Sequence, residues 1–135
     1  SFISHKLIEE PSIAALLPLC AGTISKEKAA RLVELLSSRK WFKANWPVPS
    51  VPLRSAYFDP LKYWQGPTWV NTNWLIIKGL ESYGYQDEAD QLRQKTLELV
   101  AKSGMNEYFS PINGQPAGAP NFSWTAALAI DLLKN

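Results

Sequence analysis

The chain has 135 residues, of which 46% are hydrophobic and 19% are charged, and its formal net charge is +2. This length and composition fit one domain or part of one, and they do not suggest a disordered chain. The basic residues are scattered, so a pI near 8.7 gives little support for a nucleic-acid partner. No apolar run approaches the roughly 18 residues of a membrane-spanning helix, so no membrane partner is predicted.

Cysteine and histidine are scarce, with one of each in the chain, Cys20 and His5. A single cysteine excludes an internal disulfide and a cysteine metal site. Neither residue has an activating neighbour in sequence, which disfavours a Cys/His catalytic pair. The acidic residues are dispersed, and we predict no metal site and no cofactor. No signal peptide is visible, so we expect a cytoplasmic protein, although a chain that begins with Ser1 leaves open a natural start further upstream.

Two helices are predicted in the first 38 residues. The apolar segment 13–17 predicts a short helix, for which Pro11 suits the first turn and Pro18 is the expected stop. Ser25 is a good N-cap for a second helix over about 26–38, whose apolar residues fall on one face at helical spacing.

Residues 39–66 read as a long ordered loop, because four prolines within it forbid a helix. Loops of this length in compact domains are usually functional or disordered, and the aromatic content argues against disorder. We expect five aromatic side chains to anchor the loop by burial: Trp41, Phe42, Trp46, Tyr57 and Phe58.

A third helix is predicted over 67–83, because Pro67 suits a first helical turn and Gly84 suits the C-terminal stop. Its first half is apolar on nearly all sides, which predicts a buried helix. Buried asparagines need hydrogen-bond partners, so Asn71 and Asn73 are expected either to brace loops or to face a wet cavity.

Two more helices complete the predicted set of about five. Asp87 is expected to cap an amphipathic helix that Gly104 ends. A loop over 105–122 follows, and Ser123 is expected to cap a last helix over about 124–134. No strand is predicted. Buried helices followed by amphipathic ones, with aromatic loops between them, indicate an all-α fold of the α/α toroid type.

The most informative motif is segment 63–69, which reads YWQGPTW, followed later by Glu107, Tyr108 and Phe109. Aromatic faces can stack on the apolar faces of sugar rings, and amide and indole N–H groups can bond to hydroxyls. The alternative is that these rings belong to the core. The cluster favours a site, because Gly66 and Pro67 place the rings at a loop-to-helix junction.

Two carboxylates lie near this motif. Glu107, in a glycine-containing loop beyond a helix stop, is the better candidate for acid/base chemistry, although most loop glutamates are solvated surface groups. Asp59 precedes Pro60, which is a common turn arrangement, so a structural role is favoured there. The chain has no phosphate-binding glycine loop and no protease or esterase motif.

Three segments together carry a family resemblance: 63–75, 104–114 and 122–127. In order and spacing they resemble the C-terminal end of glycoside hydrolase family 63 and its relatives, the mannosylglycerate and glucosylglycerate hydrolases. The segments 17–22 and 57–60 also look like that family, so the resemblance covers nearly the whole chain.

The resemblance implies the C-terminal part of an (α/α)6 barrel that hydrolyses α-glucosidic or α-mannosidic bonds with inversion. The family's general base is the Glu of a Glu-Tyr-aromatic-x-Pro loop, which matches Glu107. This chain has Gln65 where Arg is common in the family's Tyr-Trp-Arg-Gly-Pro-x-Trp motif. The residues expected to bind the carbohydrate substrate are Tyr63, Trp64, Gln65, Trp69, Tyr108 and Trp124.

The family's general acid is an Asp upstream of anything that matches this chain, and Asp59 lies in a different motif. About five helices also cannot close the toroid of twelve that the resemblance implies. We therefore expect residues 1–135 to be a single partial domain, inactive as a glycosidase alone, and able to form a homo-oligomer through exposed apolar faces. The alternatives are a non-catalytic carbohydrate-binding or regulatory helical module and a helical scaffold for protein partners.

Overall fold

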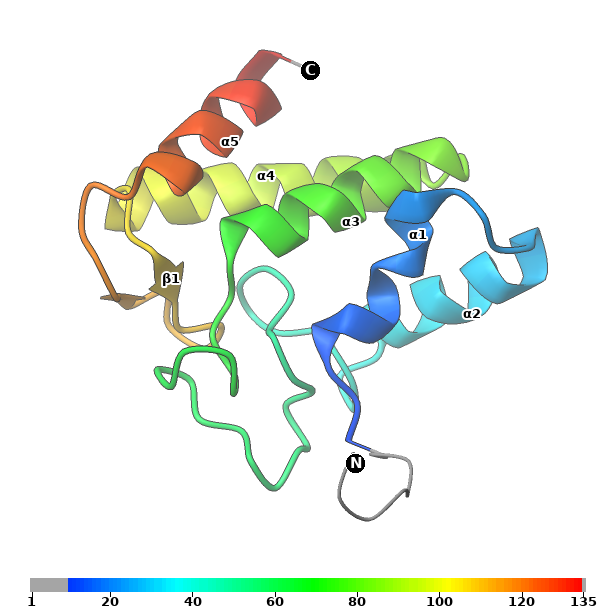
Figure 1. Ribbon diagram of the computed structural model, residues 1–135, viewed down its shortest axis with the longest axis horizontal. Helices are drawn as coiled ribbons and strands as arrows, with labels where there is room; N and C mark the ends of the chain where they lie inside the picture. The colour runs from blue at the N-terminus through cyan, green and yellow to red at the C-terminus, as the bar shows by residue number, and fades with distance from the viewer. Residues whose placement is uncertain (1–9, 135) are drawn as a thin grey trace, which may run out of the picture.

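The computed structural model describes residues 10–134, so His5 lies outside the described part of the chain. The fold is mostly helical, in agreement with the predicted all-α class, and five α-helices are joined by long loops (Figure 1). The elements in chain order are a 3-10 helix η1 (Ile13–Leu16), α1 (Pro18–Ala21), α2 (Lys26–Ser37), α3 (Val70–Ser82), α4 (Gln86–Ser103), β1 (Tyr108–Phe109), β2 (Pro116–Ala117) and α5 (Ser123–Lys134).

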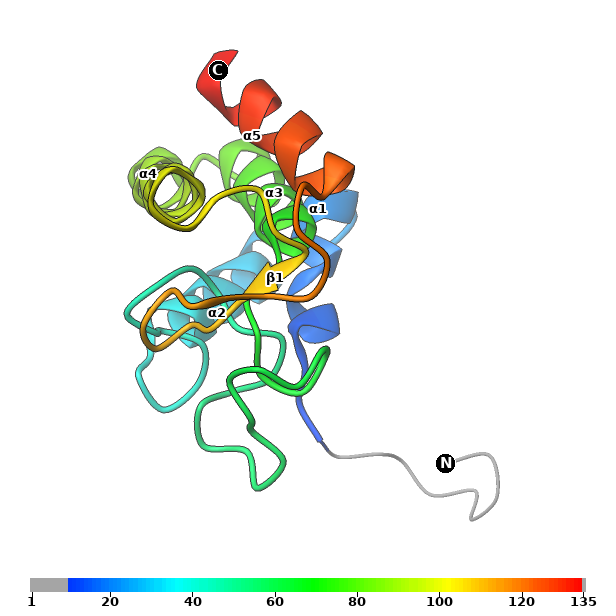
Figure 2. The ribbon, with the colours of Figure 1, turned by 90° about the vertical axis from the view of Figure 1, so that its left-hand side faces the viewer.

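Helix α3 is the centre of the molecule and contacts α1, α4 and α5. Figure 2 shows it between α4 on one side and α1 and α5 on the other. Its burial is as predicted, with Ile76, Ile77 and Leu80 at most 1% exposed. Helix α4 returns antiparallel to α3 after Gly84, whose φ of 82° is the left-handed value that the predicted helix stop requires. Its buried residues include Ala89 and Leu99, which fits the predicted amphipathic helix.

Four predicted helix ends are wrong. Pro18 begins α1 instead of stopping a helix, because a first-turn proline needs no N–H partner. Helix α3 begins at Val70, not at Pro67, because the backbone of Thr68 pairs with Phe109. Asp87 lies inside the first turn of α4 and does not cap it, since Tyr85 holds the cap position. Ser123 is the first residue of α5 instead of its cap.

The long loop between α2 and α3 is ordered by burial and by hydrogen bonds to α3. Phe42 is buried and Trp41, Trp46 and Phe58 are half-buried, whereas Tyr57 is 65% exposed, so its predicted role as an anchor is wrong. The prediction that an asparagine braces a loop is confirmed for Asn73: its Oδ1 accepts the Val48 N–H, and its Nδ2 donates to the Val48 and Trp69 carbonyl oxygens.

Two short strands form although no strand was predicted. Strands β1 and β2 pair antiparallel, with Tyr108 opposite Ala117 and Phe109 opposite Pro116. Thr68 extends this pairing through two backbone hydrogen bonds with Phe109, of 2.8 and 3.0 Å. The loop that carries Glu107 is thereby fixed to the loop that carries the aromatic motif. Among residues 10–134, no helix combines the length and the apolar character needed to cross a bilayer.

Candidate functional site

The aromatic motif forms a cluster with β1. The indoles of Trp64 and Trp69 stack at 4.1 Å between ring centroids with an interplanar angle of 3°. Tyr63 packs edge-on against Trp69 at 5.1 Å, and Tyr108 lies at 5.0 Å on a tilted plane. Four of the six predicted sugar-binding residues are therefore joined in one cluster by ring contacts.

The rings of this cluster differ in exposure. Trp69 is 2% exposed, and its indole N–H donates to the Tyr63 carbonyl oxygen at 3.0 Å. Tyr63 is 53% exposed and Trp64 is 38% exposed. The buried Trp69 ring thus packs against one face of the more exposed Trp64 ring. Tyr63 adopts a left-handed backbone with φ of 43°, which is uncommon for an aromatic residue and is often found at functional sites.

Glu107 lies beside this cluster, immediately before β1. It is half-buried, and its Oε2 accepts the Ala119 backbone N–H at 3.1 Å. Its own N–H donates to the Ala119 carbonyl oxygen at 3.0 Å. The preceding residue is held as well, because the buried hydroxyl of Thr125 donates to the Asn106 carbonyl oxygen at 2.7 Å.

A narrow cleft with no room for a water molecule brings Glu107 together with Trp69 and Trp124. Trp124 is 53% exposed at the first turn of α5, and Asn71 of α3 also lines the cleft. Asp59 does not line it: its Oδ1 accepts the N–H of Leu61, two residues on, at 3.0 Å. This is the turn role expected for Asp59. Gln65 is exposed at the end of the same turn.

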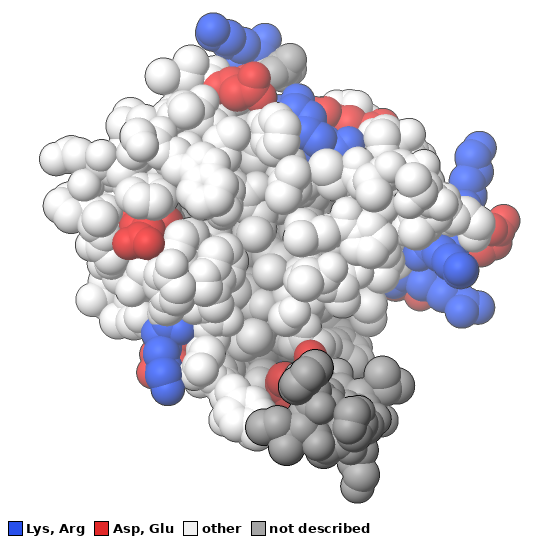
Figure 3. Space-filling view, viewed as in Figure 1, with Lys and Arg blue, Asp and Glu red and all other residues white. Residues whose placement is uncertain are grey.

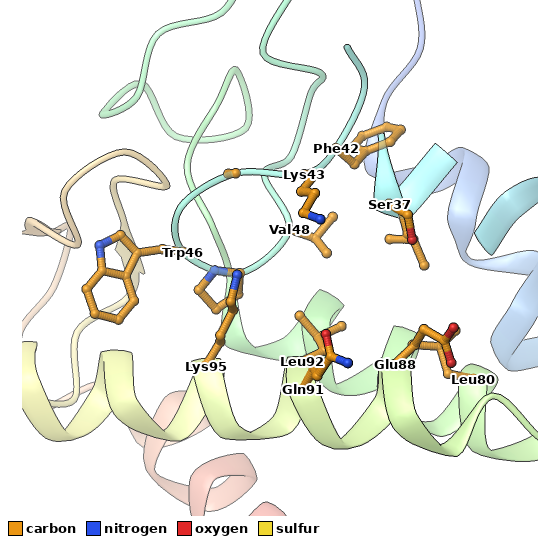
Figure 4. Close-up of a pocket in the computed structure, with 13 residues that line it drawn as sticks. Ser37, Phe42, Lys43, Trp46, Val48, Leu80, Glu88, Gln91, Leu92 and Lys95 are labelled. Atoms are coloured by element: carbon orange, nitrogen blue, oxygen red, sulfur yellow. The ribbon is translucent and has the colours of Figure 1, made fainter. Parts of the chain in front are cut away.

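A larger hollow of about 110 Å³ lies between α2, α4 and the loop 42–48, and it shares no lining residue with the cleft at Glu107. Figure 4 shows Lys43 and Lys95 on opposite sides of it, with Phe42 on the side of the loop and Leu92 on the side of α4. The hollow is open, and its polar lining includes the carboxylate of Glu88 together with Lys43 and Lys95. Neither Glu107 nor any ring of the aromatic cluster lines this hollow.

Sequence reasoning missed three residues that bear on the site: Gly118, Ala119 and Thr125. Ala119 acts through its backbone, which no residue type reveals. Gly118 has φ of 73°, and its presence in a glycine- and proline-rich loop was the one available signal. Among the described residues, no group of three His, Cys, Asp or Glu side chains is placed to hold a metal ion.

Three comparisons with known proteins point to one family. Residues 2–125 match the family model of the mannosylglycerate hydrolase MGH1-like glycoside hydrolase domain. The chain is 40% identical over 118 residues to the mannosylglycerate hydrolase of Thermus thermophilus, covering 87% of this chain and 28% of that protein. It is 29% identical over 137 residues to the glucosylglycerate hydrolase of Mycolicibacterium hassiacum, covering 97% of this chain and 30% of that protein.

The structure of a family 63 mannosylglycerate hydrolase from Thermus thermophilus in complex with glucose superposes on the whole chain. The TM-score is 0.92 at 35% sequence identity, and the match covers 32% of that enzyme. The predicted fold, part of an (α/α)6 barrel, is confirmed by this match. The chain spans under a third of the length of these relatives, and it belongs to the mannosylglycerate hydrolase MGH1-like family of glycoside hydrolases, of whose family 63 domain it forms the C-terminal portion.

Proposed function

We propose that residues 1–135 are the C-terminal lobe of an inverting α-glycosidase that hydrolyses α-glucosidic or α-mannosidic bonds. In this proposal Glu107 is the general base, and Tyr63, Trp64, Gln65, Trp69, Tyr108 and Trp124 bind the sugar. The observation that carries the proposal is a half-buried carboxylate, Glu107, that is held by the Ala119 backbone beside the aromatic cluster. The names of the relatives, mannosylglycerate and glucosylglycerate hydrolases, suggest the class of substrate.

The reaction needs two carboxyl groups. Glu107 takes a proton from a water molecule while the water oxygen bonds to the anomeric carbon on the face opposite the leaving group. The bond from the anomeric carbon to the leaving oxygen breaks, and that oxygen takes a proton from a carboxylic acid. Inverting enzymes place the two groups about 6.5–9.5 Å apart, with room for the water. Glu107 is the one carboxylate that lines the cleft among residues 10–134, and in this proposal the acid comes from another part of the barrel.

The aromatic residues take different parts in this proposal. Trp64 and Tyr63 offer exposed rings to a sugar, and Trp69 holds the Trp64 ring in place from behind. Tyr108 and Trp124 flank the carboxylate from β1 and α5. Indole and phenol rings give large contact areas at a low entropic cost, which suits a platform that must position an anomeric carbon.

A chimera tests the proposal. The 135 residues replace the matching C-terminal segment of the Thermus thermophilus mannosylglycerate hydrolase, and hydrolysis of mannosylglycerate is followed by NMR. We expect turnover with β-mannose as the first product, as inversion requires, and no turnover by the 135-residue chain alone. A chimera that folds and binds glucose but does not turn over would contradict the proposal. So would turnover by the isolated chain, since the acid would then lie within it.

Exposed apolar residues of α5 lead us to propose that the isolated chain self-associates. Ile130 is 51% exposed and Leu133 is 72% exposed. Figure 3 shows a wide uncharged face over α1, α3 and α5, with most of the charged side chains at its margins. Uncovered apolar patches usually find a partner. We expect a concentration-dependent oligomer in light scattering, and we expect Leu133→Lys to shift it toward the monomer. A strictly monomeric wild-type chain at high concentration would contradict this.

A further inference from the structure

The backbone of Ala119 contacts Glu107 at two points. Its carbonyl oxygen accepts the Glu107 N–H at 3.0 Å, and its N–H donates to Glu107 Oε2 at 3.1 Å. A backbone amide cannot rotate away as a side-chain donor can. One oxygen of the carboxylate is therefore fixed to the backbone just after β2, across the same loop.

Gly118 allows this contact. A Cβ at position 118 would lie 2.6 Å from Glu107 Oε2 and 2.7 Å from Glu107 Cβ. It would also lie 2.7 Å from a ring carbon of Tyr108. Any side chain here must push the carboxylate or the ring aside. The positive φ of Gly118 adds a second reason for glycine, but the contact with Glu107 is the one that concerns the site.

Glu107 Oε2 is thus occupied by a donor, and among the described residues Oε1 has no protein hydrogen-bond partner. An ionised carboxylate accepts through both oxygens, so Oε1 keeps its full capacity to accept a proton. Thr125 fixes the other side of the same loop through Asn106 and is only 2% exposed. The base is therefore held from the segment after β2 and from α5 at once.

We propose that Gly118 and Ala119 are positioning residues for the general base: Ala119 N–H holds Glu107 Oε2, and Oε1 is the atom that receives the proton of the attacking water. This inference rests on the proposed function of Glu107. In the step, the O–H bond of water breaks toward Oε1 as the water oxygen bonds to the anomeric carbon.

The contact is tested in the 135-residue chain by amide hydrogen exchange. We expect the Ala119 amide to exchange about tenfold faster or more in Glu107→Ala, because a hydrogen bond to a charged acceptor is lost. It should stay protected in Glu107→Gln, whose amide oxygen can still accept. The Gly84 amide, bonded to Glu81 in the α3–α4 turn, serves as an internal reference. Equal exchange at Ala119 in Glu107→Ala and wild type would overturn the inference.

The positioning role is tested by activity in the active chimera with a matched pair, Gly118→Ala and Gly84→Ala. Both glycines have positive φ, of 73° and 82°, but a Cβ at Gly84 meets nothing within 4 Å. Backbone strain is therefore common to both variants, and only Gly118→Ala displaces the carboxylate. We expect Gly118→Ala to lower kcat about 10–100-fold with little change in KM, and Gly84→Ala to leave both unchanged. Equal kcat values in the two variants would overturn the inference.

If Gly118→Ala fails to fold, a second pair of variants tests the positioning role. Thr125→Val removes the hydroxyl that holds Asn106, whereas Thr96→Val removes an equally buried hydroxyl that bonds only to its own helix at Leu92. We expect kcat to fall in Thr125→Val, to recover in Thr125→Ser, and to stay unchanged in Thr96→Val. A loss common to both valine variants would mark a structural role and overturn the inference. An active Glu107→Gln would instead contradict the proposed function, whatever the exchange result.

Discussion

Two loops of this molecule each carry a carboxylate with a glycine pressed against it, and they differ in what the glycine meets. In the Asp59 loop, a Cβ at Gly66 would lie 2.2 Å from the backbone oxygen of Asp59. In the Glu107 loop, a Cβ at Gly118 would lie 2.6 Å from the carboxylate oxygen itself. The first glycine closes a backbone turn, and the second makes room for a side chain.

The two carboxylates also differ in how far along the chain their hydrogen-bond donors lie. Asp59 Oδ1 accepts from Leu61, two residues on, so the carboxylate stabilises its own turn. Glu107 Oε2 accepts from Ala119, twelve residues on, and the side chain lines a cleft with Trp69 and Trp124. A carboxylate held by a distant backbone beside an aromatic cluster is a stronger candidate for chemistry than one that satisfies its own turn.

The largest effect on stability is expected at the residue that joins the two loops. Trp69 bonds to Tyr63 in one loop and contacts Tyr108 in the other, and it is 2% exposed. Trp69→Ala should cost about 3–5 kcal/mol in the free energy of unfolding. Denaturant unfolding checks this, with Trp64→Ala as the comparison. Trp64 is more exposed, so its loss should cost less stability while still weakening glucose binding. An equal loss of unfolding free energy in the two variants would contradict the supporting role of Trp69.

A smaller effect is expected from Gly66→Ala, which damages only the Asp59 loop. The added Cβ overlaps backbone atoms of Asp59 that cannot move without opening the turn. Overpacking of this kind costs about 1–3 kcal/mol. Thermal unfolding measures the loss against Gly22→Ala, where a Cβ meets nothing within 4 Å and only strain from a positive φ is added. A Gly66→Ala protein no less stable than Gly22→Ala would contradict the close contact.

Asp59 itself should matter less still. Asp59→Asn keeps an oxygen that can accept the Leu61 N–H, so stability should change by less than about 0.5 kcal/mol. Asp59→Ala loses that bond and should cost about 1 kcal/mol. In the chimera, both variants should keep kcat within a few-fold of wild type. A loss of turnover as large as that of Glu107→Gln, with an intact fold, would show that the distinction between the two loops is wrong.

The smallest effect is expected at Glu27, a carboxylate outside both loops. The Ser25 hydroxyl and the backbone at the start of α2 hold the pKa of Glu27 below its usual 4.5. A lowered pKa in the folded state stabilises the protein above the unfolded value, and this stabilisation is lost as pH falls through the folded pKa. Glu27→Gln should therefore unfold with slightly less dependence on pH below about 4.5 than wild type. An unchanged pH dependence would contradict the lowered pKa.

The sequence predicted those features that depend on local chemistry. Ser25 caps α2 through a hydrogen bond to the Lys28 N–H, and Gly84 and Gly104 end their helices. The apolar periodicity of α4 also identified its buried face, since helix burial follows spacing along the chain.

Features that depend on distant backbone contacts were missed. Helix α3 starts three residues later than predicted because Thr68 pairs with Phe109, 41 positions away, and this pairing overrides the preference for proline in a first turn. Strands of two residues carry no periodic pattern to detect. The sequence also could not show that Trp69 is buried and Trp64 is more exposed, because the two tryptophans have the same local preferences and differ only in their packing.

The most direct test of the central claim is the turnover of Glu107→Gln in the active chimera. The substitution keeps the size of the side chain and an acceptor for Ala119, but it removes the group that takes the proton from water. We predict a fall in kcat of about 10²–10⁴-fold, with glucose binding and circular dichroism unchanged. A kcat within a few-fold of wild type in a folded variant that binds glucose would show that Glu107 is not the general base.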